Sequence, residues 1–224
     1  MSFDHRGALK MKKLLLLGGF LGTKSDLDPL KEDLEALDFS ISSMDLLSFK
    51  KLDLEEKKDY DAYVAYSMGG RYILRNLDLL WNEKKKFIFL STGLGLDPKD
   101  KSMRRAWEDT VLEKIKSSTY EEFHCFWNGL EVFQNDSHKD FSLEWQRKKD
   151  WAQVFEDMRL SESPRFHTTF KELDLKAFLG EKDFKYQKIY NQIDYEIIPG
   201  VGHRLHLKPA KILSQKIRDY IYEC

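Results

Sequence analysis

The sequence has few of the residues that mark several common classes of protein. Its 224 residues include only two cysteines, Cys125 and Cys224. A disulfide scaffold is therefore not expected, and reduced thiols are typical of a cytoplasmic protein. Neither the cysteines nor the six histidines show metal-ligand spacing, which predicts a protein without a metal centre. The net charge of −1 gives no electrostatic reason to expect a nucleic acid or an anionic membrane as partner.

Long apolar runs are also missing. The longest one, Leu14 to Leu17 with the glycines that follow it, is far shorter than the ~20 residues that a membrane-spanning helix needs. Residues 1–10 contain no apolar region typical of a signal peptide and are interpreted as a loose lead-in. We therefore expect no membrane span.

Short apolar stretches alternate with amphipathic ones along most of the chain. Continuous apolar runs are typical of parallel strands that helices cover on both faces. The pattern predicts an α/β fold with a mostly parallel sheet of about six strands. The predicted strands are residues 12–17, 39–44, 61–66, 86–91, 174–180 and 195–198, and the predicted helices of this part are 28–37, 50–59, 71–81 and 209–222.

Residues 99–171 differ from the rest of the chain. They contain no strand-like run and many aromatic and charged residues, and they predict helices at 103–116, 120–127 and 141–158. A helical insertion between strands of a parallel sheet is typical of a cap over the strand ends. We predict a single domain over residues 1–224, with its core at 11–98 and 172–224 and a helical cap at about 99–171.

Ser67 lies between the predicted strand 61–66 and the predicted helix that follows. Ala65 precedes it by two residues and Gly69 follows it by two. A serine on a sharp strand-to-helix turn, with small residues at these two positions, is the nucleophile elbow of α/β-hydrolases. The small residues are needed because the turn is strained and both elements crowd it.

A serine nucleophile needs a histidine base and a carboxylate that orients the base. In this fold the chain order is serine, acid, histidine, and Ser67, Asp183 and His203 satisfy it, each at the end of a predicted strand. His206 is the second candidate for the base, and Asp97 is the second candidate for the acid. An aspartate in such a position is also a common turn former.

A glycine-rich turn, residues 18–22, follows the first predicted strand. In the α/β-hydrolase fold this loop supplies one oxyanion donor, and the residue after the nucleophile supplies the other. The candidates are the N–H groups of Phe20 and Met68. The turn has neither the Gly-x-Gly-x-x-Gly pattern nor a Gly-Lys-Ser/Thr motif, so we expect no nucleotide cofactor.

Several motifs together resemble one family with the α/β-hydrolase fold, the 2-succinyl-6-hydroxy-2,4-cyclohexadiene-1-carboxylate synthases of menaquinone biosynthesis. Residues 66–71, Tyr-Ser-Met-Gly-Gly-Arg, match a block of that family without a break. Residues 17–22 are similar to its His-Gly-Phe-Leu-Gly motif, with Gly18 at the position of the histidine. Residues 179–185 and 198–203 resemble its acid and histidine motifs.

The resemblance implies an activity and a set of binding residues. The family eliminates pyruvate from a cyclohexene that bears carboxylates, and it uses the triad as a base system without a metal or an organic cofactor. It therefore implies an anionic small-molecule substrate, which arginines bind well because their planar fork fits a carboxylate. Arg71 belongs to the block that matches without a break, and more loosely matching positions in the predicted cap add Arg105, Trp127 and Arg147 to the candidate substrate-binding residues.

Other functions remain open at this point. Residues 148–150, Lys-Lys-Asp, differ from the polar run of the family, and any one of the arginines could instead form a surface ion pair. The same scaffold hosts many activities. A carboxylesterase or thioesterase acting on a small acyl substrate is the first alternative, and a non-catalytic binding protein with this fold is the second.

Overall fold

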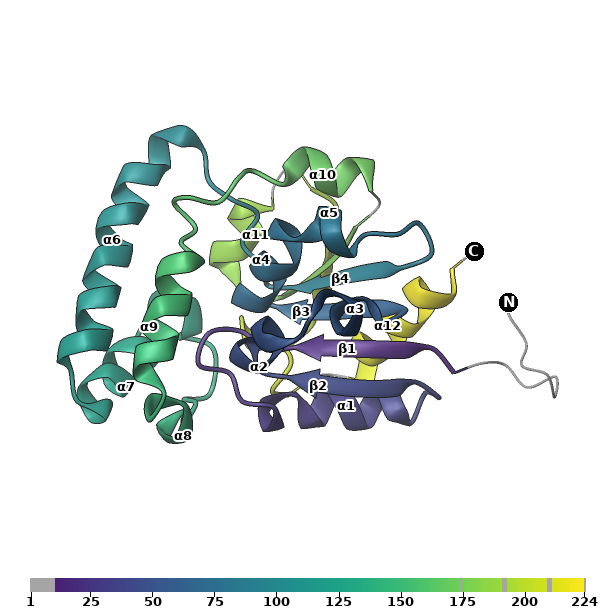
Figure 1. Ribbon diagram of the computed structural model, residues 1–224, viewed down its shortest axis with the longest axis horizontal. Helices are drawn as coiled ribbons and strands as arrows, with labels where there is room; N and C mark the ends of the chain where they lie inside the picture. Colours follow the sequence, from purple (N-terminus) through teal and green to yellow (C-terminus); the bar gives the residue numbers. More distant parts are fainter. Residues whose placement is uncertain (1–10, 174, 191–192, 209–210, 224) are drawn as a thin grey trace.

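The computed structural model describes residues 11–173, 175–190, 193–208 and 211–223. Figure 1 shows a central sheet with helices on both faces and a separate group of helices, α6 to α9, beyond one end of the strands. The arrowheads of β1 and β2 point toward this group, so it lies at the carboxyl ends of the strands. The predicted lead-in 1–10, and the predicted starts of a strand at Asp174 and of a helix at Pro209, lie outside the described residues.

The six strands of the sheet are all parallel, in the order β2-β1-β3-β4-β5-β6. This confirms the predicted α/β fold and its sheet of about six strands. The strands are β1 (Lys13–Leu17), β2 (Ser40–Met44), β3 (Ala62–Tyr66), β4 (Lys86–Leu90), β5 (Lys176–Gly180) and β6 (Glu196–Ile198).

Alternate side chains of β1 enter two different apolar layers. Leu14 and Leu16 pack in a cluster that includes residues of α1 (Asp28–Glu35) and α12 (Lys211–Tyr222). Leu15 and Leu17 belong to a second cluster on the other face. Because both faces of the strand are covered, its sequence is apolar at every position rather than at every second one.

Two of the predicted helices outside the segment 99–171 are interrupted. The predicted helix 50–59 is wrong, because α2 (Leu46–Lys51) ends and Asp53 begins α3 (Leu54–Lys58) with a capping box to Glu56. The predicted helix 71–81 is interrupted at Asn76, between α4 (Met68–Arg75) and α5 (Leu77–Leu80).

The segment between β4 and β5 is helical, with no strand among its described residues. Its aromatic side chains Phe123 and Trp151 belong to the same apolar cluster as Leu15 and Leu17 of the sheet. The predicted helix 141–158 is two helices. The helices of this segment are α6 (Pro98–Ser117), α7 (Tyr120–Asn128), α8 (Ser142–Trp145), α9 (Lys148–Asp157) and α10 (His167–Glu172), with a 3₁₀ turn at Glu131–Phe133.

Two shorter elements complete the described chain, a 3₁₀ turn at Ser25–Leu27 and the helix α11 (Phe184–Ile189) after β5. Among the helices of the described residues, none is both long and apolar enough to cross a membrane.

Candidate active site

Ser67 forms the turn between β3 and α4 with a strained backbone. Its φ of 50° and ψ of −112° place a non-glycine residue in a sparsely populated region. A Cβ atom at Gly69 would lie 2.3 Å from the carbonyl oxygen of Gly18, and one at Gly70 would lie 2.0 Å from Thr92 Oγ1. The small residues after the serine are therefore required by close packing against the β1 loop and the β4 loop.

The structure brings Ser67, His203 and Asp183 together at the carboxyl ends of the strands. The Nδ1 atom of His203 lies 2.8 Å from Asp183 Oδ2, and its Nε2 atom lies 3.4 Å from Ser67 Oγ. With Nδ1–H donating to the carboxylate, Nε2 keeps its lone pair toward the serine. The Nε2–Oγ distance is long for a hydrogen bond, as is common in a site without substrate.

Asp183 is held by more than the histidine. Ser91, which follows β4, donates from its hydroxyl to Asp183 Oδ2 at 2.8 Å. The ring of Tyr186, on α11, packs against His203 with centroids 4.5 Å apart. Sequence reasoning missed both residues. Ser91 could have been suspected because it follows a strand of the same sheet edge, next to the strand that precedes Asp183.

The second candidates lie elsewhere. His206 is buried and packs against Tyr66 with ring centroids 3.9 Å apart, and it forms no hydrogen bond with Ser67 in the described structure. Burial, followed by the nearby cations, lowers the pKa of His206 well below its usual value. Asp97 forms an ion pair of 2.5 Å with Arg165. Neither is connected to the serine.

Phe20 and Met68 both line a cavity that also includes Ser67 and His203. Within the described residues, neither of their backbone N–H groups donates a hydrogen bond. Two free donors beside a serine hydroxyl are the arrangement that stabilises an oxyanion.

This larger cavity has a volume of about 220 Å³ and lies between the sheet and the helical insertion. Arg71 lines it from α4 and is buried at 7% exposure. Its Nη1 donates to the carbonyl oxygen of Met158 at 2.6 Å, and it pairs with no carboxylate of the described residues. Burial lowers the pKa of Arg71 to about 10, so the side chain still carries its charge at neutral pH.

Two further cations line the larger cavity, and sequence reasoning missed both. Arg104, on α6, donates from Nε to Glu108 Oε1 at 2.8 Å and lies over the ring of Trp107. Lys185, on α11, has no hydrogen bond or ion pair within the described structure. Burial, and then the charge of Arg104, lowers the pKa of Lys185. Among the described lining residues, Glu131 is the one carboxylate that could offset the positive charge of these cations.

Glu108 is almost fully buried and connects Arg104 to the end of the insertion. Its carboxylate accepts hydrogen bonds from the Leu160 N–H at 2.8 Å and from the Ser161 hydroxyl at 2.5 Å. Although burial alone would raise the pKa of Glu108, the bonds from Ser161 and Arg104 lower it overall. The carboxylate is therefore charged and fixes Arg104 at the cavity wall.

Two of the predicted substrate-binding arginines are not at this cavity. Arg105 is partly exposed and pairs with Asp109 and Glu162. It is not in the lining although Arg104 is, because adjacent residues on a helix point in different directions. Arg147 pairs with Asp45 and Glu144 and is also absent from the lining. The structure does place Trp127 in the lining.

No protein-family model matches the chain. A Haemophilus influenzae protein that carries the provisional name 2-succinyl-6-hydroxy-2,4-cyclohexadiene-1-carboxylate synthase is 27% identical over 243 residues, covering 94% of this chain and 98% of that protein. MenH from S. aureus superposes with a TM-score of 0.76 at 18% identity, over 95% of this chain and 94% of that one. The chain has the α/β-hydrolase fold. A thermophilic esterase from Thermogutta terrifontis shares it with a TM-score of 0.59 at 16% identity, over 94% and 89% of the two chains.

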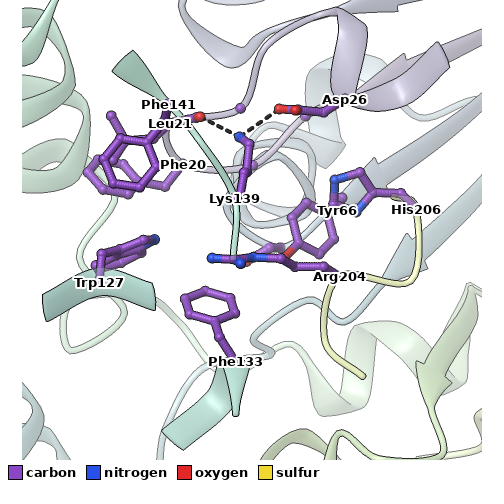
Figure 2. A pocket seen from close by; sticks show the side chains of 14 residues that line it. Phe20, Leu21, Asp26, Tyr66, Trp127, Phe133, Lys139, Phe141, Arg204 and His206 are labelled. Atoms are coloured by element: carbon purple, nitrogen blue, oxygen red, sulfur yellow. Dashed lines mark hydrogen bonds and ion pairs between the residues drawn. The ribbon is translucent and has the colours of Figure 1, made fainter. Parts of the chain in front are cut away.

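A second, smaller cavity of about 30 Å³ also touches Ser67. Figure 2 shows that Lys139 and Arg204 reach it from different directions, on either side of Tyr66. Lys139 Nζ binds Asp26 Oδ2 and the carbonyl oxygen of Leu21, each at 2.6 Å. Among the described residues, Ser67 thus borders both this smaller cavity and the larger one.

Among the described residues, no group of three or more His, Cys, Asp or Glu side chains is placed to hold a metal ion. The free thiol of Cys125 is exposed and lies outside both cavities.

Proposed function

We propose that this protein is a triad-dependent, pyruvate-eliminating lyase, acting in the cytoplasm on a carboxylated cyclohexene like that of the menaquinone-pathway synthases. In this proposal Ser67, His203 and Asp183 form the base system. Phe20 and Met68 supply the oxyanion donors, and Arg71, Arg104 and Trp127 bind the substrate.

The proposed chemistry begins with the removal of a proton from the carbon next to a carbonyl group. Ser67 Oγ takes this proton while its own hydroxyl proton passes to His203 Nε2, and Asp183 stabilises the charged imidazole that results. The electron pair of the broken C–H bond forms a C=C bond, and the C–O bond to the leaving group breaks. The pyruvate enolate that leaves takes up the proton held by His203 and becomes pyruvate, which restores the neutral imidazole. The N–H groups of Phe20 and Met68 stabilise the negative charge that develops on the carbonyl oxygen.

The charges of the larger cavity favour such a substrate. A buried guanidinium without a carboxylate partner is costly, and a carboxylate of the substrate would compensate it. Arg71 is in this state, and it stands four residues after Ser67, one helical turn along α4. Arg104 and Lys185 add positive charge on two other walls.

The observation that carries the proposal is the unpaired Arg71 in the cavity that also contains Ser67 and His203. The resemblance of residues 66–71 to the synthase block and the 27% identity to the Haemophilus influenzae protein support it. The fold alone would not support the proposal, because the same fold serves many activities.

The experiment is turnover of the synthase substrate, measured as pyruvate release, against a panel of neutral p-nitrophenyl esters and acyl thioesters. The proposal expects kcat/KM on the carboxylated substrate to exceed that on every ester by at least about a hundredfold. It also expects the activity to persist in EDTA, since the proposed chemistry uses no metal.

A carboxylesterase or thioesterase remains the alternative proposal, because a serine elbow with two free N–H donors suits acyl transfer equally well. Faster turnover of the esters than of the carboxylated substrate would replace the lyase proposal with this one. The absence of turnover in both assays, from a folded protein, would favour a non-catalytic binding protein.

A further inference from the structure

The smaller cavity beside Ser67 contains a buried cation that the proposed reaction does not yet use. Arg204 follows the histidine of the proposed triad directly and is 6% exposed. Its Nη1 donates to the carbonyl oxygen of Ser137 at 2.8 Å, and its guanidinium lies over the ring of Phe133 at 4.0 Å. Asp136 accepts from the backbone N–H of Arg204 and not from its side chain.

No carboxylate of the described residues pairs with this guanidinium. Among the described residues, the carbonyl oxygen of Ser137 is the one hydrogen-bond acceptor for its five N–H donors, although the side chain is as buried as that of Arg71. The second cation of the cavity, Lys139, is already compensated by Asp26. The lining thus carries one positive charge in excess, counting Arg204 and Lys139 against Asp26.

One residue of the lining has a buried nitrogen without a hydrogen-bond partner among the described residues. His206 is 3% exposed, and its Nδ1 atom makes no hydrogen bond in the described structure. A buried polar atom without a hydrogen-bond partner is rare in natural proteins. Figure 2 shows the ring of His206 beside Tyr66, above Arg204.

The dimensions of the cavity limit what can occupy it. A volume of about 30 Å³ is the room of about two water molecules, since one water needs roughly 10–15 Å³ measured in this way. Two oxygen positions close together are also what a carboxylate group requires. A phosphate or a ring would not fit.

The cavity is adjacent to the larger one. Ser67, Phe20, Trp127 and Phe133 line both, whereas Arg71 lines only the larger cavity and Arg204 only the smaller. The serine therefore lies between two buried arginines that pair with no carboxylate of the described structure.

We infer that the smaller cavity is a second carboxylate subsite, in which Arg204 binds one acidic group of the substrate while Arg71 binds another. The substrate class is then an acid with carboxylates on both sides of the carbon that reacts at Ser67. This inference rests on the proposed function for its anionic substrate, and it adds that two separated carboxylates are required.

Binding, rather than turnover, tests this inference independently of the reaction. The Ser67→Ala protein is titrated calorimetrically with α,ω-dicarboxylates from succinate to pimelate, and with the monomethyl ester of each. We expect at least one dicarboxylate to bind about tenfold or more tightly than its monoester. In the Ser67→Ala/Arg204→Gln protein this advantage should disappear while the monoester affinity stays unchanged.

Two further variants keep the test decisive. Arg204→Lys retains the charge and should restore part of the advantage even where Arg204→Gln lowers stability. Arg218→Gln removes an exposed arginine on α12 and should change nothing. If no dicarboxylate exceeds its monoester, or if the advantage survives Arg204→Gln, the second subsite is wrong, whatever the synthase assay gives. Failure of the synthase assay with a retained dicarboxylate advantage would reject the reaction and keep the subsite.

Discussion

Arg71 is hydrogen-bonded to the carbonyl oxygen of Met158, at 2.6 Å, and pairs with no carboxylate in the described structure. The first prediction concerns this guanidinium. Charge-assisted hydrogen bonds are worth about 1.5–3 kcal/mol, so Arg71→Ala should lower kcat/KM on a carboxylated substrate about ten- to a hundredfold. A neutral ester of similar size should be affected less than about threefold. Equal losses on both substrates would show that Arg71 supports the structure through Met158 and does not bind substrate.

Arg104 and Arg105 provide a matched pair for the second prediction. Arg104 lines the larger cavity, whereas Arg105 pairs with Asp109 and Glu162 on the exposed side of α6. We expect Arg104→Ala to raise KM for a carboxylated substrate about tenfold or more, and Arg105→Ala to leave it within about twofold. Exposed ion pairs contribute only ~0–1 kcal/mol, so Arg105→Ala should also change stability little. The reverse pattern of KM values would restore Arg105 as the binding residue.

The third prediction separates the chemistry of Ser67 from its strain. Both Ser67→Ala and Ser67→Gly should remove almost all turnover, because neither has a hydroxyl. Glycine adopts a positive φ without steric cost, so Ser67→Gly should be at least as stable as Ser67→Ala, although glycine loses more entropy on folding. Urea unfolding of the three proteins measures this. An alanine variant more stable than the glycine variant by over ~1 kcal/mol would contradict the strain at this turn.

The fourth prediction is a loss of anion binding at alkaline pH. The pKa of Arg71 is lowered to about 10, and that of Lys185 is also lowered by burial. A base with a lowered pKa is still cationic at neutral pH and loses its charge as the pH rises through that pKa. Between pH 8 and 10.5, kcat/KM for a carboxylated substrate should therefore fall relative to that for a neutral ester. Circular dichroism at each pH is the control for unfolding. If the ratio of the two kcat/KM values stays constant over this range, Arg71 and Lys185 do not bind the carboxylates of the substrate.

His206 gives the fifth prediction, which concerns stability in acid. Its pKa is well below 6.5 in the folded protein, chiefly through burial, and close to 6.5 in the unfolded chain. Below pH 6.5 the unfolded state binds a proton that the folded state does not, so the free energy of unfolding decreases as the pH falls. Between pH 6.5 and 5 this linkage amounts to at most about 2 kcal/mol. His206→Asn should lose less stability over this interval than the unmodified protein.

The matched control for the fifth prediction is His138→Gln, which removes an exposed histidine and should keep the original pH dependence. If His206→Asn and the unmodified protein lose stability equally between pH 6.5 and 5, the imidazole of His206 is protonated in the folded state.

The strands could be predicted to within a residue or two, because the central strands are separate apolar runs and the edge strand Ser40–Met44 alternates. The helix boundaries could not. Asp53 begins α3 through a side-chain cap in the middle of the predicted helix 50–59, and Asn76 interrupts the predicted helix 71–81. Both breaks are local hydrogen-bond choices inside a continuous amphipathic pattern, which the periodicity of apolar residues does not reveal.

The proposed triad could be selected from chain order and strand ends, but the cavity lining could not. α6 carries charged residues around much of its circumference, so no apolar stripe indicates whether Arg104 or Arg105 faces inward. Arg204 and Lys139 meet at the smaller cavity from positions 65 residues apart in the sequence. Their proximity depends on the tertiary structure of the insertion, so no local sequence pattern indicates it.

The absent side chain at Gly69 has a consequence for the energetics of the site. Because the backbone of α4 rests directly on the carbonyl group of Gly18, no flexible group lies between the two turns that carry the Met68 and Phe20 N–H groups. The spacing of these two donors is set by main-chain contact and not by the position of the helical insertion. Reorganisation of the oxyanion donors should therefore contribute little to the activation barrier, whether the insertion is open or closed over the substrate.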